Sequence, residues 1–364
     1  MSCRSLYYYD FIIIGGGVIG CSVAYFLKRN FPHYRVCIIE KNIDVGLEIS
    51  SHNSGIIHVP FYTSPFSLKS KLIDLVEIEK FLDKFGVPVF KNGMLIVFNY
   101  NMLELLRRFH YILYGLINGV RFKILSGKEV KRLEPDIECD GGIFLPDVMV
   151  IDPYILTRSI FEACLNLGVY AYLQEKVEKI FVQSNDDFVV ITNRGVYFAR
   201  NIINAAGLEA VEIFNKLSRE KLVLEPVVGN YFRVKRDLSI QRPVFFLESS
   251  SSETKGINIR RDFKRNVLIG PDAIKIRDNS NLEDSIQKSL SQMLFLLNKY
   301  LNGNFGPEDL EFAYYGIRPR IKGFKDFVIK VIRGRRGIII NLLNIDSPGL
   351  SAALGISKYI ISQL

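Results

Sequence analysis

Three glycines and one glutamate near the start of the chain have the types and the spacing needed to bind a dinucleotide. Gly15, Gly17 and Gly20 follow an apolar run, and Glu40 ends a second apolar run. Gly15 permits a tight turn, Gly17 lets the backbone approach a pyrophosphate, and Gly20 lets a helix pack closely on a strand. The Glu40 carboxylate can accept hydrogen bonds from a ribose 2′-OH and would repel a 2′-phosphate, so an NADP-type ligand is not expected. A glycine-rich turn without a ligand is the alternative interpretation.

The elements that must position these residues can be read from the same stretch. The apolar runs at 9–14 and 36–39 predict two strands, and the residues between them have helical spacing. Such a βαβ unit contains every part of a dinucleotide-binding fingerprint. Val18 and Ile19 would begin the helix, whose free N–H groups and partial positive charge favour phosphate. We therefore place Val18 and Ile19 in the predicted cofactor site, together with Lys41, which follows the glutamate.

The size and composition are those of an ordinary globular protein. The 364 residues are enough for two domains with separate cores, and 48% of them are hydrophobic. The net charge of +9 could favour anionic substrates or acidic lipid, but no basic tract with interleaved aromatic residues indicates nucleic-acid binding. The five cysteines are widely separated, so neither a metal site nor a disulfide framework is expected, and a reducing cytoplasm fits best. No apolar run reaches the roughly 20 residues of a transmembrane span.

A second group of motifs gives the chain a family resemblance. His52-Asn53-Ser54-Gly55-Ile56-Ile57-His58 follows the βαβ unit, and Ser67-Leu68-Lys69-x-Lys71-Leu72 comes next. With the opening fingerprint, these motifs resemble the D-amino-acid-oxidase-type FAD-dependent oxidoreductases, and most closely the L-2-hydroxyglutarate dehydrogenase and glycerol-3-phosphate dehydrogenase branches. The resemblance implies that FAD is the cofactor and that the segment of Ser51, His52, Asn53, Ser54 and Gly55 lines its isoalloxazine. Some other members attach FAD covalently to a histidine aligned with His52, but a non-covalent contact is expected here.

The resemblance also implies the fold. An α/β fold is expected, with a Rossmann-like FAD-binding domain and an α+β substrate domain built on a mostly antiparallel sheet. The FAD-binding domain would be discontinuous, with segments 1–75, 148–225 and 311–364. The substrate domain would take 76–147 and 226–310.

Further cofactor contacts are implied in the later segments. Val177 would lie against the adenine, and Ala206 and Gly207 end a buried strand that passes under the cofactor. Ser347-Pro348-Gly349-Leu350 follows a strongly apolar strand and begins a second helix. In the resembling families that helix points at the flavin N1/O2 edge, where its dipole stabilises negative charge.

The chemistry itself is assigned to residues far apart in the sequence. Arg318, in Gly-Ile-Arg-Pro, resembles the family's substrate-side arginine, and its planar fork can hold a carboxylate or phosphate in two hydrogen bonds. His58 lies in the flavin-facing segment, where an imidazole can take a hydroxyl proton. Tyr62, Tyr231 and Asn258 are placed with Arg318 around the substrate. A salt bridge for Arg318 and a packing role for His58 are the alternatives.

The chain departs from both named branches at several positions. Asn258 stands where they usually have histidine, and it can form hydrogen bonds but cannot serve as a base. Val59-Pro60-Phe61 replaces Ser-Gly-Ile, Thr63 replaces a second tyrosine, and Phe66 replaces glycine. The pocket is therefore expected to be bulkier and less polar than theirs.

The predicted function is an FAD-dependent dehydrogenase. It would oxidise a small anionic 2-hydroxy acid resembling L-2-hydroxyglutarate, with hydride transfer to flavin N5. The alternatives are an amine or amino-acid dehydrogenase or oxidase, a glycerol-3-phosphate dehydrogenase, and an FAD-binding subunit without catalysis. The electron acceptor would be a quinone, a carrier protein or oxygen.

A quinone acceptor would allow peripheral contact with the inner membrane face. The C-terminal helix could provide that contact, but packing on the sheet is the favoured role. Another helical stretch, 101–119, carries Phe109, Tyr111 and Tyr114, and their side chains are expected in the core.

Overall fold

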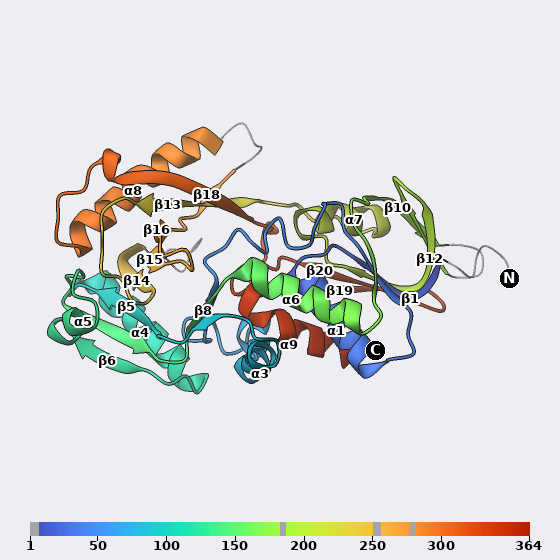
Figure 1. Ribbon diagram of the computed structural model, residues 1–364, viewed down its shortest axis with the longest axis horizontal. Coiled ribbons are helices and arrows are strands. Elements are labelled where there is room, and N and C mark those ends of the chain that lie inside the picture. Colours follow the sequence, from blue (N-terminus) through green and yellow to red (C-terminus); the bar gives the residue numbers. More distant parts are fainter. Residues whose placement is uncertain (1–6, 183–186, 250–255, 277–281) are drawn as a thin grey trace.

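A computed structural model describes residues 7–182, 187–249, 256–276 and 282–364. Two large sheets occupy the two ends of an elongated molecule (Figure 1). Helices and strands alternate around the first sheet, and strands of the second sheet are mostly antiparallel, so the expected α/β fold with an antiparallel second sheet is confirmed.

The first sheet has eight strands in the order β10-β11-β12-β1-β2-β9, and β20 and β19 extend it beyond the second half of β12. Strands β20, β12, β1, β2 and β9 are parallel, as in a dinucleotide-binding sheet. The strand bounds are β1 Tyr8–Ile14, β2 Val36–Ile39, β9 Tyr170–Tyr172, β10 Val177–Val182, β11 Phe188–Thr192, β12 Val196–Asn204, β19 Val328–Arg333 and β20 Ile338–Leu343. Of these strands, β2 and β20 are almost continuously apolar, as is typical of parallel strands buried within a fold.

Helices α1 (Val18–Asn30), α6 (Pro153–Asn166) and α9 (Gly349–Ile361) pack together against this sheet, and α7 (Ala210–Leu217) packs against β12 and β20 (Figure 1). Most of α9 is buried, so the C-terminal helix packs within the fold as expected. Its burial follows from a sequence that is apolar or small on nearly every face.

The second sheet has nine strands in the order β17-β13-β16-β15-β14-β5-β7-β6, with β18 beside β13. All its pairs are antiparallel except β14 with β5. The bounds are β5 Met94–Phe98, β6 Lys123–Ser126, β7 Gly141–Leu145, β13 Val227–Val234, β14 Val244–Phe246, β15 Asn258–Arg261, β16 Val267–Gly270, β17 Ile274–Lys275 and β18 Leu310–Arg318. Helices α4 (Met102–Ile117), α5 (Gly127–Leu133) and α8 (Leu282–Tyr300) accompany this sheet. Phe109 of α4 is 68% exposed, so the expectation that its side chain lies in the core is wrong, because the core is reached from the opposite face of the helix.

Short elements connect the two sheets. Strands β3 (Ile56–Ile57), β8 (Met149–Ile151) and β4 (Val89–Phe90) form a three-stranded sheet. Helix α2 (Leu68–Lys71) follows β3, and helix α3 (Leu75–Phe85) precedes β4.

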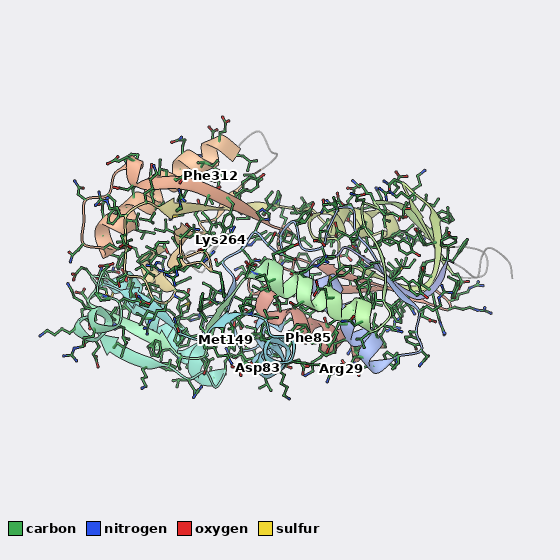
Figure 2. The ribbon with its side chains drawn as sticks, viewed as in Figure 1. Arg29, Asp83, Phe85, Met149, Lys264 and Phe312 are labelled. Carbon is green, nitrogen blue, oxygen red and sulfur yellow. The ribbon has the colours of Figure 1, made fainter. Side chains whose placement is uncertain are left out.

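Two elements differ from the expected domain division. Strand β18 lies almost entirely in the segment 311–364 assigned to the FAD-binding domain, yet it pairs with β13 along its whole length. Helix α3 was assigned to the substrate domain from residue 76, yet its buried face packs against α9. Arg29 at the end of α1 also pairs with Glu77 of α3 at 3.1 Å, and Figure 2 places Arg29, Asp83 and Phe85 on one side of the molecule. The domain in which β18 and α3 lie is therefore decided by the strands and helices that they contact, which are distant in sequence.

Candidate functional site

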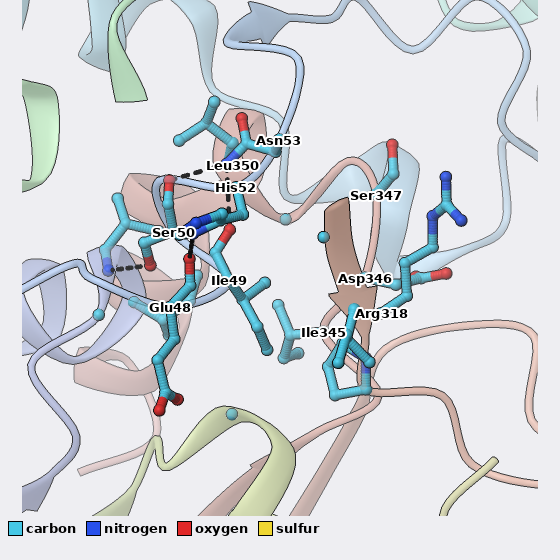
Figure 3. Close-up of a pocket in the computed structure, with 18 of the residues that line it drawn as sticks. Glu48, Ile49, Ser50, His52, Asn53, Arg318, Ile345, Asp346, Ser347 and Leu350 are labelled. Atoms are coloured by element: carbon cyan, nitrogen blue, oxygen red, sulfur yellow. Dashed lines mark hydrogen bonds between the residues drawn. The ribbon is translucent and has the colours of Figure 1, made fainter. Parts of the chain in front are cut away.

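A cavity of about 560 Å³ lies between the two large sheets. Its walls include the carboxyl ends of β1, β2 and β20, the turn after β12, and residues of β13, β15 and β18. Figure 3 shows Glu48, Ser50 and His52 on one side of it and Arg318, Asp346 and Ser347 on the other. In open parallel sheets, ligands bind beyond the carboxyl ends of the strands, and this cavity has that position.

The three glycines of the fingerprint each have the geometry that the sequence predicts. Gly15 has φ +101°, and a Cβ there would lie 2.5 Å from the Ala205 carbonyl oxygen. A Cβ on Gly20 would lie 2.0 Å from the Gly15 oxygen, so this glycine permits the close packing of α1 on the turn. Gly17 lies on the cavity wall, where its missing side chain leaves the backbone open. Val18 and Ile19, at the start of α1, line the same wall.

Glu40 is fixed in place by the backbone. Its two oxygens accept hydrogen bonds from Gly16 N at 2.7 Å and from Asn42 N at 2.8 Å. Each oxygen retains acceptor capacity for a ribose hydroxyl. Lys41, next to it on the wall, pairs with Glu48 at 2.8 Å and with Glu209 at 3.1 Å.

The segment after β2 is a run of turns held by its own side chains. His52 Nδ1 lies 2.8 Å from the Glu48 carbonyl oxygen, and the Asn53 amide spans the turn by donating to Ser50 O and accepting from Gly55 N. His52, Asn53 and Ser54 line the cavity. Ser51 does not, because its side chain bonds back to Glu48 O and lies beside a second, outer cavity.

The remaining predicted cofactor residues come together from distant segments. Val177, Ala206 and Gly207 line the end of the cavity near Glu40, and the start of α9 contributes the four residues Ser347, Pro348, Gly349 and Leu350. Helix α9 begins without a side-chain cap. Its positive end therefore faces the cavity, as the start of α1 does.

Arg318 is the most unusual polar side chain on the wall. Its Nη2 donates to the Asp272 carbonyl oxygen at 2.8 Å, while its Nη1 is buried without a hydrogen-bond partner. Burial lowers the pKa of the Arg318 guanidinium from its ordinary value. Asn258 Oδ1 is also buried and unpartnered. Buried polar groups are nearly always satisfied, so these two atoms point to a ligand with polar groups of its own.

His58 and Tyr62 form a connected pair, but only His58 lies on the wall. The Tyr62 hydroxyl contacts His58 Nδ1. Tyr62 is only 3% exposed, and burial raises the pKa of its hydroxyl well above the ordinary value. Tyr62 itself does not reach the cavity, because its ring stacks on Phe245 in the core. Tyr231 does line the cavity, and its hydroxyl lies 3.1 Å from Ser54 Oγ.

Several wall residues were not predicted from the sequence. Ser50 Oγ accepts a hydrogen bond from Val18 N at 2.9 Å. Ser351 Oγ accepts from His58 N at 2.8 Å, which ties α9 to the segment that carries the histidine. Lys69 contacts one oxygen of Asp346, whose other oxygen accepts from Arg320 Nε at 2.9 Å. Lys69 lies within a motif already singled out and the other four lie beside one, so proximity to these motifs was the only signal available. The unpredicted wall residues that make these polar contacts are Ser50, Lys69, Arg320, Asp346 and Ser351.

The fold and the site thus define a dinucleotide-binding protein with a second sheet closing over the ligand. The model of the family described as FAD dependent oxidoreductase matches residues 10–363. The chain belongs to this family and is an FAD-dependent oxidoreductase.

Individual relatives agree with this assignment. The glycerol 3-phosphate dehydrogenase of Caloramator mitchellensis is 30% identical, over 98% of this chain and 74% of that protein. The glycerol 3-phosphate oxidase of Mycoplasma genitalium is 28% identical, over 98% of this chain and 94% of that one. The L-2-hydroxyglutarate dehydrogenase of Escherichia coli K12 is 27% identical, over 73% of this chain and 64% of that one.

A solved structure has the same fold. The L-α-glycerophosphate oxidase from Mycoplasma pneumoniae, determined with FAD bound, has a TM-score of 0.85 at 24% identity, over 97% of this chain and 94% of that one. The resemblance inferred from the sequence motifs is therefore confirmed, as is FAD as the cofactor.

The residues present fit FAD. The open backbone at Gly17 and the uncapped start of α1 suit the pyrophosphate, and the fixed carboxylate of Glu40 suits a ribose. At the other end, the start of α9 faces the space where the flavin ring would be held. No helix in the described part of the chain is both long and apolar enough to cross a membrane.

Proposed function

We propose that this enzyme oxidises the secondary alcohol of a small, doubly charged anion, with glycerol 3-phosphate as the leading candidate. The observation that carries the proposal is the buried, unpartnered Nη1 of Arg318 on the cavity wall. A charged donor without a partner is costly in a folded protein unless a ligand anion completes it.

The charges nearby support a doubly charged substrate. Lys69, Arg318 and Arg320 lie on the cavity wall beside the Asp346 carboxylate, which pairs with Lys69 and Arg320. Three cations against one anion leave a sum of +2 for these four side chains. A zwitterionic amino acid would leave that charge uncompensated, whereas a phosphate monoester carries about −1.5 to −2 at neutral pH.

FAD, when bound, supplies the acceptor for the hydride that leaves the alcohol carbon. The chain's own residues have two tasks. Arg318 would hold the anionic group through Nη1 while Asp272 O keeps its other branch in place. His58 would accept the hydroxyl proton at Nε2, with Nδ1–H donated to the Tyr62 oxygen, so that the alcohol becomes a ketone as the C–H and O–H bonds break.

His58 is better placed for this task than the other histidines. Of the four histidines in the chain, only His52 and His58 line the cavity. His52 Nδ1 is already held by the turn that faces the dinucleotide. Asn258, which stands where the related branches usually have histidine, cannot take a proton and would instead form a hydrogen bond with the substrate.

A 2-hydroxy acid such as L-2-hydroxyglutarate is the second candidate. The motifs of the sequence favour it, and the same arginine could hold its carboxylate. Glycerol 3-phosphate is preferred because the relatives named for it align over 98% of this chain at 27–30% identity. The L-2-hydroxyglutarate dehydrogenases align over 73–98% of this chain at a lower identity of 24–27%.

Anaerobic titration of the purified flavoprotein tests the proposal. Glycerol 3-phosphate, L-2-hydroxyglutarate, proline and sarcosine would be added separately while the visible flavin absorbance is recorded. We expect glycerol 3-phosphate to bleach the flavin fastest. Bleaching by proline or sarcosine alone would establish an amine oxidoreductase, and bleaching by none would favour an FAD-binding subunit without this chemistry.

A further inference from the structure

Buried polar groups connect the substrate-side arginine to helix α8. The main-chain oxygen of Asp272 accepts the hydrogen bond from Arg318 Nη2 at 2.8 Å. The carboxylate of the same residue is held elsewhere, since one oxygen accepts from Asn230 N at 2.8 Å and the other accepts from Ser289 Oγ. Asp272 is only 1% exposed. It therefore meets Arg318 with its main chain and α8 with its side chain.

The α8 end of this connection is a cluster of buried polar side chains. Asn230 Nδ2 donates to Ser289 Oγ at 2.8 Å and to Ser285 Oγ at 3.2 Å. The two serines lie one turn apart on α8, and their side chains are buried to make hydrogen bonds and not to add apolar packing. The other buried residues of α8 are large and mostly apolar, namely Met293, Leu296, Leu297 and Tyr300. We call Asn230, Asp272, Ser285 and Ser289 the anchor network.

Strand β13 fits closely around the guanidinium that the anchor network supports. A Cβ on Gly229 would lie 3.0 Å from Arg318 Nη2 and 3.1 Å from Asp272 O. It would also lie 2.7 Å from Pro271 Cβ. Asn230, the next residue of β13, holds the Asp272 carboxylate. Two consecutive residues of one strand thus leave room for the guanidinium and fix the group that accepts its hydrogen bond.

We infer that Asp272 and Ser289 are positioning residues for the substrate anion, because they set the direction of the free branch of Arg318. A guanidinium is planar and rigid, so fixing Nη2 also fixes the direction in which Nη1 points. Nη1 is the branch proposed to hold the anion, and the inference rests on that proposed function. Helix α8, all of whose residues the structure describes, contributes none of them to the cavity wall. It takes part in substrate binding only through the anchor network.

A purely structural role for the anchor network predicts a different outcome. The loss of a buried hydrogen bond would then lower the thermal stability and leave the affinity for the substrate unchanged. A positioning role predicts a weaker affinity with little change in the rate of flavin reduction at saturation, because neither His58 nor the FAD-binding residues belong to the network.

Anaerobic stopped-flow reduction of the FAD-loaded full-length enzyme by glycerol 3-phosphate measures the affinity and the rate separately. Ser289→Ala should raise the Kd for the substrate on the order of tenfold, as expected for residues coupled in one hydrogen-bond network. The limiting rate of flavin reduction and the FAD content should stay within about twofold of the wild type. Ser291→Ala is the matched control, because Ser291 is an exposed residue of the same helix whose Oγ bonds only to Gln287 O. The control should leave the Kd unchanged.

Asp272→Asn tests whether the network acts through hydrogen bonds or through charge. Asparagine keeps the main-chain oxygen and an acceptor for Asn230 N, and its amide can donate to Ser289 Oγ. Because these hydrogen bonds can be retained, we expect a Kd within about threefold of the wild type. A loss as large as that in Ser289→Ala would overturn the inference, because the charge of Asp272 would then support Arg318.

The decisive comparison repeats Ser289→Ala in an Arg318→Gln background. Without the guanidinium, Ser289→Ala should raise the Kd by less than about twofold further, because its effect passes through Arg318. An effect of the same size in both backgrounds, or an unchanged Kd in Ser289→Ala alone, would overturn the inference. If Ser289→Ala does not fold, Ser289→Cys takes its place, since a thiol is similar in size but donates only a weak hydrogen bond.

The same measurements separate a failure of this inference from a failure of the proposed function. Reduction of the wild type by L-2-hydroxyglutarate and not by glycerol 3-phosphate would reject the leading substrate, and the variants would then be compared with that acid. Reduction of the wild type by neither anion would overturn both.

Discussion

Replacing Arg318 with lysine is the sharpest test of the substrate side of the cavity. The lysine keeps the positive charge but loses the planar fork, so a single ammonium would have to satisfy both Asp272 O and the substrate anion. In the wild type these two tasks fall to separate nitrogens, since Nη2 bonds to Asp272 O at 2.8 Å and Nη1 has no protein partner. The variant should therefore retain FAD and lose affinity for the substrate.

The size of the loss follows from the one hydrogen bond at stake. A hydrogen bond involving a charged group contributes about 1.5–3 kcal/mol, which corresponds to a factor of roughly 10–150 in kcat/KM. Arg318→Gln, which removes the charge as well, should fall at or beyond the upper end. Arg233→Lys is the control, because Arg233 pairs with Glu311 on the surface, where both side chains are about half exposed.

The assay combines steady-state kinetics with the flavin content of each purified variant. A fall in kcat/KM of the predicted size in Arg318→Lys, with FAD content unchanged and Arg233→Lys like the wild type, is the expected result. An equal loss of FAD and of substrate saturation would refute the reasoning, because it would place Arg318 in the support of the cofactor.

Three further tests address the FAD-binding side of the cavity and the proposed base, His58. Gly17→Ala should weaken FAD binding by about tenfold or more but leave the fold intact. The new Cβ would meet only Ser50 Oγ, at 3.0 Å, and would otherwise face the ligand. Flavin release on dilution measures the loss of FAD affinity. Tyr62→Phe should lower kcat by about tenfold with little change in KM and should shift the pH profile of kcat, because His58 loses the group that orients it; an unchanged profile would remove Tyr62 from the mechanism. Acid precipitation should give a colourless pellet, and a yellow one would show that FAD is covalently bound and would argue for a link at His52.

The dinucleotide half of the site could be predicted because its determinants are local. The turn at Gly15, the open backbone at Gly17 and the carboxylate of Glu40 all follow from residue types at fixed spacing within one βαβ unit. Each requires only a strand, a helix and a second strand in sequence, and the structure has these at β1, α1 and β2. The start of α9 could be placed for a similar reason, since a strongly apolar strand runs directly into it.

The substrate half could not be derived in this way because its contacts join distant segments. Asp272 O reaches Arg318 across 46 positions, and Lys69 reaches Asp346 across 277. No periodicity encodes such pairs. Tyr62 shows the same limit, because its spacing from His58 predicts a neighbour but not whether that neighbour faces the cavity or the core.

The cationic side chains of the cavity differ in whether the protein gives them a carboxylate partner. Lys69 and Arg320 share Asp346, so their charges are largely neutralised within the protein and hold the start of α9 against β18 and α2. Arg318 has only a neutral carbonyl for one branch, and burial disfavours its charge. A bound anion would give Arg318 the charged partner that the protein does not provide. Substrate binding would therefore stabilise the charged form of the guanidinium. The alternative considered from the sequence was a salt bridge at Arg318, which would leave its guanidinium already paired before substrate binds. Among the described residues, no carboxylate lies within salt-bridge distance of Arg318.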